Sequence, residues 1–425
     1  MSLSPVIYSQ YTQILKEELI PALGCTEPIC IAYASAKARQ TLGEFPEMAI
    51  VESSGNIIKN CKGAIVPNTG SLKGIAAAAV IGIVGGDPDK KLEVLSGVTS
   101  ENVARAKEIL KTDFCRVKLL TTPALLHVIV TVKSAGHSAL VEIVHTHTNI
   151  VRIEKDGQTI FEKPYDPKKF NDSMTDRSVL NVKDIKEFAD TVELSELSDL
   201  IERQIDCNSR ISEEGLKHPY GVQVGYNLRK YYGDDVKIKA KAAAAAGSDA
   251  RMSGCTLPVV INSGSGNQGM TVSLPVIEYA KYLKVSHEKL IRALILSNLI
   301  AIHQKTGIGR LSAYCGAVSA ACGSGAGITY LYGGTYEQIC RTITNTLADI
   351  PGIVCDGAKP SCAAKIASSV DAAIMAHCLS MANKSFQPGD GIIESNVEET
   401  IENVGILGRE GMKETDEEIL KLMIK

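Results

Sequence analysis

Alternation of apolar and polar residues is clearest between positions 115 and 163, where it predicts β-strands. The runs CRVKLL, HVIVTVKS, SALVEIVHTH and NIVRIEKDGQTIFEK change character at nearly every second residue, as expected of strands whose successive side chains point to opposite faces. Asp156-Gly157 interrupts the last run and is a typical hairpin turn sequence. We therefore expect antiparallel strands in this region.

Helical patterns fill most of the remaining chain. Residues 5–45 have such a pattern, interrupted at PALGCTEP, and residues 47–95 mix short apolar runs with Gly and Asn turns before a helix of small residues. From residue 182 to residue 425 the patterns are mostly helical, rich in Ala, Gly, Ser and Cys, and broken by Gly-rich turns. The polar segment 165–178 between these regions is the best linker candidate.

These patterns together predict an α+β fold in three parts. The N-terminal helices, residues 1–45, are expected to pack on a mostly helical C-terminal lobe of residues 181–425. Residues 46–180 are expected to form a smaller α/β lobe with antiparallel strands. A chain of 425 residues is longer than one hydrophobic core usually holds. The active site is expected between the lobes, where ligand sites are common.

Composition narrows the class of protein. Hydrophobic residues make up 45% of the chain, charged residues make up 22%, and the net charge is −3. Such values are typical of a globular protein and give no support to nucleic acid or an anionic membrane as a partner. The first residues are not a basic segment followed by an apolar one, and the apolar runs are short. We expect a cytoplasmic protein, with a homodimer inferred by analogy only.

Twelve cysteines in a cytoplasmic protein point away from a disulfide framework, because the cytosol keeps thiols reduced. The alternatives are cluster or metal ligands, catalytic thiols and unreactive buried residues. Cys25 follows Pro21 and Gly24, which are expected to end one helix, and precedes Thr26, the expected cap of the next. The dipole of that second helix would lower the pKa of the Cys25 thiol.

The loop Ser263–Gly269 matches the GxGxxG pattern, but its context is not that of a dinucleotide site. Helical patterns follow the loop, whereas a dinucleotide site needs a second strand that ends in an acidic residue. Successive N–H groups at the start of a helix favour an anion nest for a carboxylate or phosphate, and a tight structural turn is the alternative. The similar turns at 53–56 and 67–70 are more typical of structure than of function.

Four cysteines in the C-terminal part have spacings that suit a metal or cluster site. Cys315 and Cys322 are seven residues apart and can share a helix face, whereas Cys355 and Cys362 fall in a loop that contains Gly and Pro. Two loop thiols and a third from a neighbouring helix are able to hold an iron–sulfur cluster, which leaves one iron open as a Lewis acid. By spacing alone, zinc or no metal is equally admissible.

Two further features have simpler explanations. His145 and His147 alternate on one face of a strand, as metal ligands do, yet a polar sheet face explains them without a third ligand. Lys305 is a candidate Schiff-base lysine for pyridoxal phosphate, but nothing beside it in the sequence marks a phosphate site.

Seven segments, in order, resemble the L-cysteine desulfidase family, which is related to the iron–sulfur L-serine dehydratases. They are GCTEP, SSGNIIKN, VPNTG, SDARMSG, NSGSGNQG, HQKTGIGRLSAYCGAVSAACG and VCDGAKPSCAAK. The resemblance covers essentially the whole length, and seven motifs in the right order are much more specific than any one of them. The C-terminal half is similar to the dehydratases in a more distant way.

The resemblance implies a [4Fe–4S] cluster held by three thiolates, those of Cys315, Cys355 and Cys362, with the fourth iron facing the substrate. It also implies that Cys25 is the reactive cysteine outside the cluster. Six residues separate Cys355 from Cys362, where the dehydratases have a longer interval. This difference favours cysteine over serine as the substrate and makes Cys322 a rival to Cys362 as a ligand.

On this basis we expect β-elimination of L-cysteine to pyruvate, ammonia and sulfide, with Cys25 as the base and an open iron as the Lewis acid. The expected substrate-binding residues are Asn56, Asn68, Thr69, Ser265, Asn267, Gln268 and Gly269. The alternatives are an L-serine or L-threonine dehydratase, a pyridoxal phosphate lyase, and a non-catalytic protein that binds a cluster or senses redox state.

Overall fold

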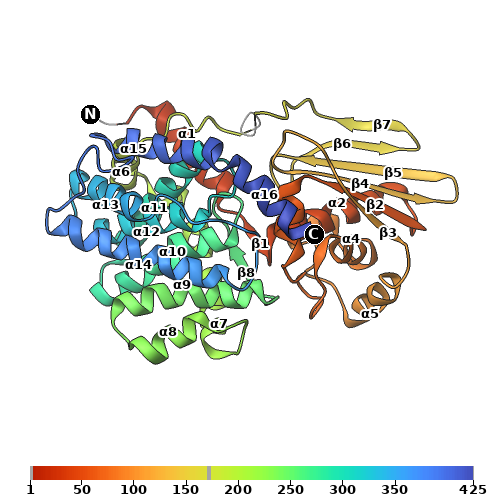
Figure 1. Ribbon diagram of the computed structural model, residues 1–425, viewed down its shortest axis with the longest axis horizontal. Helices are drawn as coiled ribbons and strands as arrows, with labels where there is room; N and C mark the ends of the chain where they lie inside the picture. Colours follow the sequence, from red (N-terminus) through yellow and green to blue (C-terminus); the bar gives the residue numbers. More distant parts are fainter. Residues whose placement is uncertain (1–2, 170–173, 425) are drawn as a thin grey trace.

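A six-stranded mixed sheet forms the smaller lobe, on the right of Figure 1, of a computed structural model that describes residues 3–169 and 174–424. Its strand order is β3-β2-β4-β5-β6-β7, and every neighbouring pair is antiparallel except β2 and β3, which are parallel. The strands are β2 (Met48–Ser53), β3 (Cys115–Leu119), β4 (His127–Ser134), β5 (His137–Val144), β6 (Ile150–Lys155) and β7 (Gln158–Glu162).

The strands expected between residues 115 and 163 are confirmed, and so is the hairpin turn. Lys155 pairs with Gln158 across Asp156 and Gly157, whose φ angles of 52° and 78° are those of a left-handed two-residue turn. One detail of the prediction is wrong, because β3 is parallel to its neighbour β2. A long crossover through α3 (Gly55–Lys62), α4 (Gly74–Gly85) and α5 (Ser100–Ile109) separates these two strands, and such a crossover permits parallel pairing.

Helix α2 (Thr26–Leu42) packs on the sheet, which corrects the expectation that both N-terminal helices lie on the helical lobe. It contacts β4 and β5 on one side and α4 on the other, so it is buried nearly all round. Small residues allow this close packing, since a Cβ atom on Gly82 of α4 would lie 2.4 Å from the carbonyl oxygen of Ala32. Helix α1 (Pro5–Glu18) does pack on the helical lobe, where the rings of Tyr11 and Phe188 are 5.5 Å apart.

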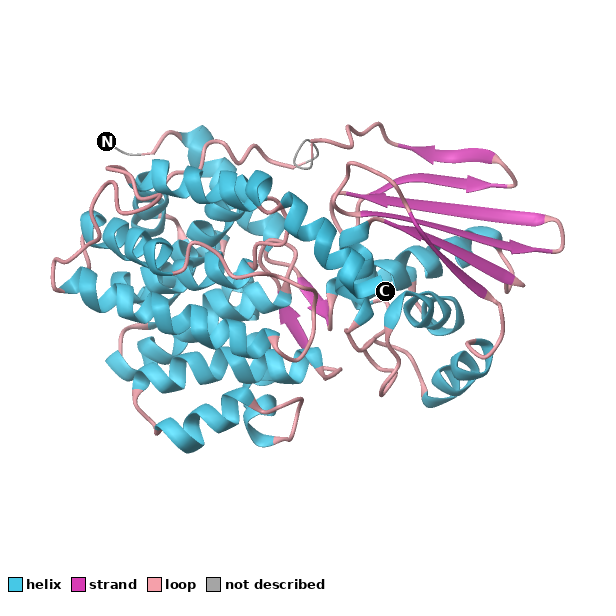
Figure 2. Cartoon of the chain, in the orientation of Figure 1, coloured by secondary structure: helices cyan, strands magenta, loops and turns pink. Residues whose placement is uncertain are grey.

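The larger lobe is helical and lies on the left of Figures 1 and 2. Helix α12 lies at its centre and contacts α10, α11, α13 and α14. The helices are α6 (Val182–Thr191), α7 (Ser198–Lys217), α8 (Val224–Tyr232), α9 (Val236–Met252), α10 (Gly266–Leu283), α11 (His287–Ile308), α12 (Gly316–Leu331), α13 (Tyr336–Asp349), α14 (Cys362–Met381) and α15 (Val397–Ile406). Short helical turns lie at Pro88–Glu93, Leu194–Glu196 and Leu407–Gly411.

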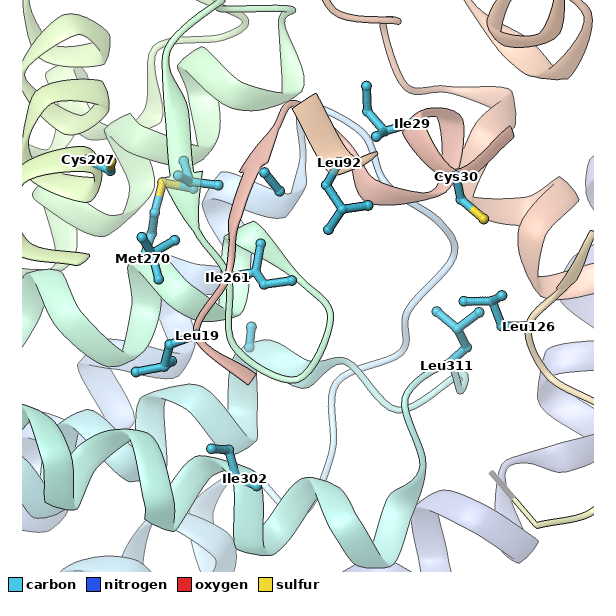
Figure 3. Packing of buried hydrophobic residues seen from close by; sticks show 14 of the residues in the cluster. Leu19, Ile29, Cys30, Leu92, Leu126, Cys207, Ile261, Met270, Ile302 and Leu311 are labelled. Atoms are coloured by element: carbon cyan, nitrogen blue, oxygen red, sulfur yellow. The ribbon is translucent and has the colours of Figure 1, made fainter. Parts of the chain in front are cut away.

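Three connections join the lobes. Strand β1 (Pro21–Leu23) pairs antiparallel with β8 (Pro258–Val260), and the C-terminal helix α16 (Lys413–Ile424) crosses back to pack on α3. A single apolar core continues through the junction, and Figure 3 shows Leu19, Leu92, Ile261 and Leu311 within it. The mutual position of the lobes is therefore fixed by strand pairing and by a shared core.

The linker predicted at 165–178 connects β7 to α6. Residues 170–173 of this segment lie outside the described residues, and the parts on either side contain neither helix nor strand. Among the residues described, α14 is long and apolar enough to cross a bilayer, and half of its most apolar window is buried inside the protein. The α+β fold expected from the sequence is confirmed.

Candidate active site

Four helices begin at the wall of one cavity between the lobes. The cavity holds about 680 Å³, including its open mouth, and its lining residues include Cys25, Ser265, Cys315 and Cys362. Cys25, Ser265 and Cys315 are the cap residues of α2, α10 and α12, and Cys362 is the first residue of α14. Because the N-terminus of a helix carries partial positive charge, the four helices together make the cavity favourable for anions.

Cys315 and Cys355 are brought together by backbone pairing between two loops. Tyr314 and Val354 form an antiparallel bridge, the N–H of Cys315 donates to Ile353 at 2.8 Å, and the N–H of Cys355 donates to Ala313 at 2.6 Å. A hydrogen bond from the Cys315 thiol, helped by the charge of Lys59, lowers the pKa of Cys355 to about 5 despite its burial. One of these two thiols is therefore poised to be a thiolate, the form that binds metal.

Cys362 completes a set of three cysteines that line the cavity. Its N–H donates to the carbonyl oxygen of Lys359 at 2.9 Å, and burial raises the pKa of its thiol. Within the described ranges, three or more Cys, His, Asp or Glu groups do not converge as a single metal ion would require. Thiolates that hold an iron–sulfur cluster bind different iron atoms and need not converge on one point. The donor set, three free thiols beside Lys59 and Lys305, fits such a cluster.

Cys322, the rival ligand, is turned away from the cavity. It is completely buried in α12, and its thiol donates to the carbonyl oxygen of Ile343 at 3.8 Å. It is absent from the cavity lining, whereas Cys315, Cys355 and Cys362 are present.

Cys25 caps α2, but its environment differs from the one the sequence predicts. The cap residue is Cys25 itself rather than Thr26, and the thiol donates a hydrogen bond of 3.2 Å to Glu27 Oε2. Burial and the negative charge of Glu27 raise the pKa of Cys25 well above its ordinary value, against the opposing charge of Arg251. The expected acidic thiol is therefore wrong, since burial and a carboxylate outweigh the helix dipole.

Glu27 is a buried carboxylate with several partners. Its Oε1 accepts from Asn60 at 3.0 Å and lies 3.9 Å from Nε2 of His147, while its Oε2 accepts from Thr26 at 3.1 Å as well as from Cys25. Burial opposes ionisation, yet the nearby side chain of His147, with the thiol hydrogen bond of Cys25, lowers the pKa of Glu27 to about 2. This carboxylate is therefore ionised and holds the proton of the Cys25 thiol.

The loop Ser263–Gly269 brings three of its four predicted binding residues to the cavity. Ser265, Asn267 and Gln268 line it, and Gln268 Oε1 is buried without a hydrogen-bond partner among the described residues. Gly269 is outside the lining, because it lies against the carbonyl oxygen of Val260, where a Cβ atom would come within 2.0 Å. Gly269 thus allows α10 to pack on β8.

The three remaining predicted residues also fall outside the lining of this cavity. The amide of Asn68 donates to the carbonyl oxygen of Leu95 at 2.6 Å, and the hydroxyl of Thr69 donates to that of Val66 at 2.6 Å. Asn56 lies in α3 with its Oδ1 buried and, among the described residues, unpartnered. Asn68 and Thr69 stabilise their own turn, in agreement with the structural role that the sequence favours for residues 67–70.

Three cations line the cavity, and sequence reasoning assigned none of them to this site. Arg251 is buried, and its guanidinium donates to Gly24 at 3.0 Å and to Asn267 at 3.1 Å. Lys305 is buried beside Cys355, and burial lowers its pKa to about 8; Arg310 lines the same cavity. All three cations fall inside resembling motifs, Arg251 in SDARMSG and the other two in HQKTGIGRLSAYCGAVSAACG. The motifs therefore contained the signal, although none of the three residues was assigned to the site.

Comparison with known proteins identifies the family. Residues 89–421 match the family model described as "Serine dehydratase alpha chain". The chain belongs to this family. Family members are typically iron–sulfur dependent. The resemblance noted in the sequence is confirmed as far as the serine dehydratase alpha chain family, which is a lyase-type dehydratase family. The matched span contains the Ser263–Gly269 loop and all three cavity cysteines of the C-terminal lobe, and it begins after Cys25.

Several relatives are similar over their full length. A protein of Lachnoclostridium phytofermentans named "UPF0597 protein" is 60% identical over 98% of this chain and 100% of its own. A protein of the same name from Treponema denticola is 54% identical over 100% of both chains, and one from Fusobacterium nucleatum is 46% identical over 97% and 98%. These relatives share both lobes with this member of the family.

Proposed function

We propose that this protein is an L-cysteine desulfidase, which eliminates sulfide from L-cysteine to give pyruvate and ammonia. A [4Fe–4S] cluster would be held by Cys315, Cys355 and Cys362. The observation that supports this proposal is the gathering of these three thiols with the thiol of Cys25 and the guanidinium of Arg251 around one cavity.

The substrate carboxylate would bind at Arg251 and the start of α10. Arg251 is held by Gly24 and Asn267, so its guanidinium is already oriented at the cavity wall. Charge-assisted hydrogen bonds of this kind are the strong ones for a carboxylate. The N–H groups at the start of α10 add an anion nest, and the unpartnered Oε1 of Gln268 is an acceptor suited to the substrate ammonium.

The chemistry divides between the cluster and the chain. When bound, the cluster supplies a Lewis-acidic iron that favours departure of the sulfur from Cβ. Cys25 takes the proton from Cα, which requires its sulfur to be near that hydrogen. The aminoacrylate that is released tautomerises to an imine and hydrolyses to pyruvate and ammonia in water.

A second candidate is an L-serine dehydratase, and the family description favours it. It would use the same residues with water as the leaving group. The interval of six residues between Cys355 and Cys362, shorter than in the dehydratases, is the reason to place cysteine first.

The deciding experiment is release of sulfide and pyruvate from L-cysteine, beside L-serine, by anaerobically reconstituted protein of known iron content. Sulfide that depends on bound iron supports the proposal, and pyruvate from serine alone overturns it in favour of the dehydratase. Activity that survives iron chelation indicates a pyridoxal phosphate enzyme. Full iron content with neither product indicates a cluster-binding protein without this activity.

A further inference from the structure

A second cavity between the lobes lies close to the first. It holds about 810 Å³, including its mouth, and its lining includes Glu18, His147, Lys163 and Gly264. Arg310 lines both cavities. The proposed chemistry uses the first cavity only, so the second one needs an explanation.

A line of three side chains connects the two cavities. Cys25 and Glu27 line the first cavity and His147 lines the second. The thiol of Cys25 is 3.2 Å from Glu27 Oε2, and Nε2 of His147 is 3.9 Å from Glu27 Oε1. All three side chains are buried, and Nε2 of His147 has no hydrogen-bond partner among the described residues.

We propose that Glu27 and His147 carry the substrate proton from Cys25 to the second cavity. This inference rests on the proposed function, in which Cys25 takes a proton from Cα. Because Cys25 rests as a thiol, its own proton must leave as the new one arrives. The Cα–H bond breaks as an S–H bond forms, and the original S–H bond breaks as an O–H bond forms on Glu27.

His147 is the group that takes the proton from Glu27. Its Nε2 lies 3.9 Å from Glu27 Oε1 and has no hydrogen-bond partner among the described residues, so it is available as an acceptor. The protonated carboxyl group turns about its Cγ–Cδ bond and delivers the proton to Nε2 of His147. The imidazolium then releases a proton to water in the second cavity, which restores the resting thiol and carboxylate.

The groups that face Glu27 are compatible with this route. Cys30 and Cys61 contribute like charge when ionised, but burial raises the pKa of each, so both remain neutral. Asn60 is neutral and holds Oε1 in place at 3.0 Å. The charge of Arg251 favours the thiolate of Cys25.

The first test uses cluster-free protein and needs no turnover. Iodoacetamide alkylation of Cys25 is followed by mass spectrometry at pH 8 in the wild type and in Glu27→Gln. The variant loses the charge that holds the thiol proton, so its Cys25 should react at least about tenfold faster, the effect of one pKa unit. Equal rates would overturn the inference.

A matched control exists on the sheet, where the carboxylate of Glu142 is buried and lies 2.8 Å from Nε2 of His127. Glu142→Gln removes a comparable Glu–His pair outside the lining of both cavities. It should leave the alkylation rate of Cys25 unchanged. A rate increase as large as that of Glu27→Gln would overturn the inference, because it would show general loosening of the fold.

The second test addresses His147 in cluster-loaded protein. His147→Ala should lower kcat by roughly 100-fold, as loss of a proton-transfer group does, with unchanged iron content. Added imidazole should restore part of kcat through the second cavity, and no restoration would overturn the role of His147. If the wild type releases no product from cysteine or serine, the proposed function fails, and the alkylation comparison still decides whether Glu27 holds the thiol proton of Cys25.

Discussion

The buried ammonium of Lys59 in α3 forms an ion pair with the carboxylate of Asp416 in α16. The side chain of Lys59 is 1% exposed, and its charge is one of the causes that lower the pKa of Cys355. The C-terminal helix therefore fixes a cation behind one of the proposed cluster ligands. Two segments that are more than 350 residues apart in the sequence support the same site.

Breaking this ion pair should destabilise the protein. Asp416→Asn leaves the buried Lys59 ammonium without a counter-charge, and removal of one partner of a buried pair typically costs about 3–5 kcal/mol. Urea denaturation monitored by circular dichroism measures the change. The double variant Lys59→Met with Asp416→Leu should recover most of the loss, since apolar replacements of a buried pair are often neutral. A double variant less stable than Asp416→Asn alone would contradict this account.

Substitution of the candidate cluster cysteines should distinguish ligands from non-ligands by the iron content of the variants. Cys315→Ser should lose bound iron after anaerobic reconstitution, because a thiolate ligand is removed from the cavity wall. Cys322→Ala should keep its iron and its activity and lose only about 1–2 kcal/mol of stability, since it creates a small void in α12. Iron and sulfide assays on these two purified variants and on Cys362→Ser measure this. Iron loss in Cys322→Ala with retention in Cys362→Ser would make Cys322 the third ligand instead.

Much of the fold is predictable because its signals are local. The alternation in residues 115–163 and the Asp156-Gly157 turn specify strands and a hairpin without reference to the rest of the chain. The position of α2 is not local in this sense. Buried residues, many of them small and apolar, occur on nearly every side of α2, so the sequence pattern does not indicate which face packs inward. The position of α2 is decided by its packing on β4, β5 and α4.

The site was predictable as far as sequence motifs reach. Cys25, Ser265, Cys315 and Cys362 belong to resembling motifs and line one cavity. The state of the Cys25 thiol was not predictable, because it depends on burial and on the ionised carboxylate of Glu27. The pKa of that carboxylate is in turn lowered by His147, which lies 120 residues further along the chain. Long-range electrostatic partners of this kind leave no spacing pattern in the sequence.

Arg251 should control affinity for the substrate. Arg251→Met removes the proposed partner of the substrate carboxylate, and a hydrogen bond to a charged group is worth about 1.5–3 kcal/mol, so KM should rise roughly 10- to 150-fold. Steady-state sulfide release measures KM and kcat. Arg251→Lys keeps the charge but loses the guanidinium that Gly24 and Asn267 hold in place, so its KM should lie between those of the wild type and Arg251→Met. Arg292→Met, whose guanidinium binds Ala189 on the helical lobe, is the control, and equal effects of both changes would contradict the assignment.

Asp249 should make stability depend on pH. It is completely buried in α9, its Oδ2 accepts from the N–H of Gly225 at 3.0 Å, and burial raises its pKa from 3.8 to about 6. The folded state therefore holds this proton more tightly than the unfolded chain does. The resulting stabilisation is complete below about pH 4 and is lost as the pH rises through 6.

The asparagine in Asp249→Asn does not ionise, so the variant should not lose this stabilisation as the pH rises. The unfolding free energy of the variant relative to wild type should increase by up to about 3 kcal/mol between pH 4 and pH 7, which corresponds to about two pKa units. Urea denaturation at intervals across this range measures the difference. Asp206→Asn on α7, whose side chain is 63% exposed, should instead follow the wild type at a nearly constant offset. Parallel curves for Asp249→Asn and wild type would show that the buried carboxyl group does not titrate in this window.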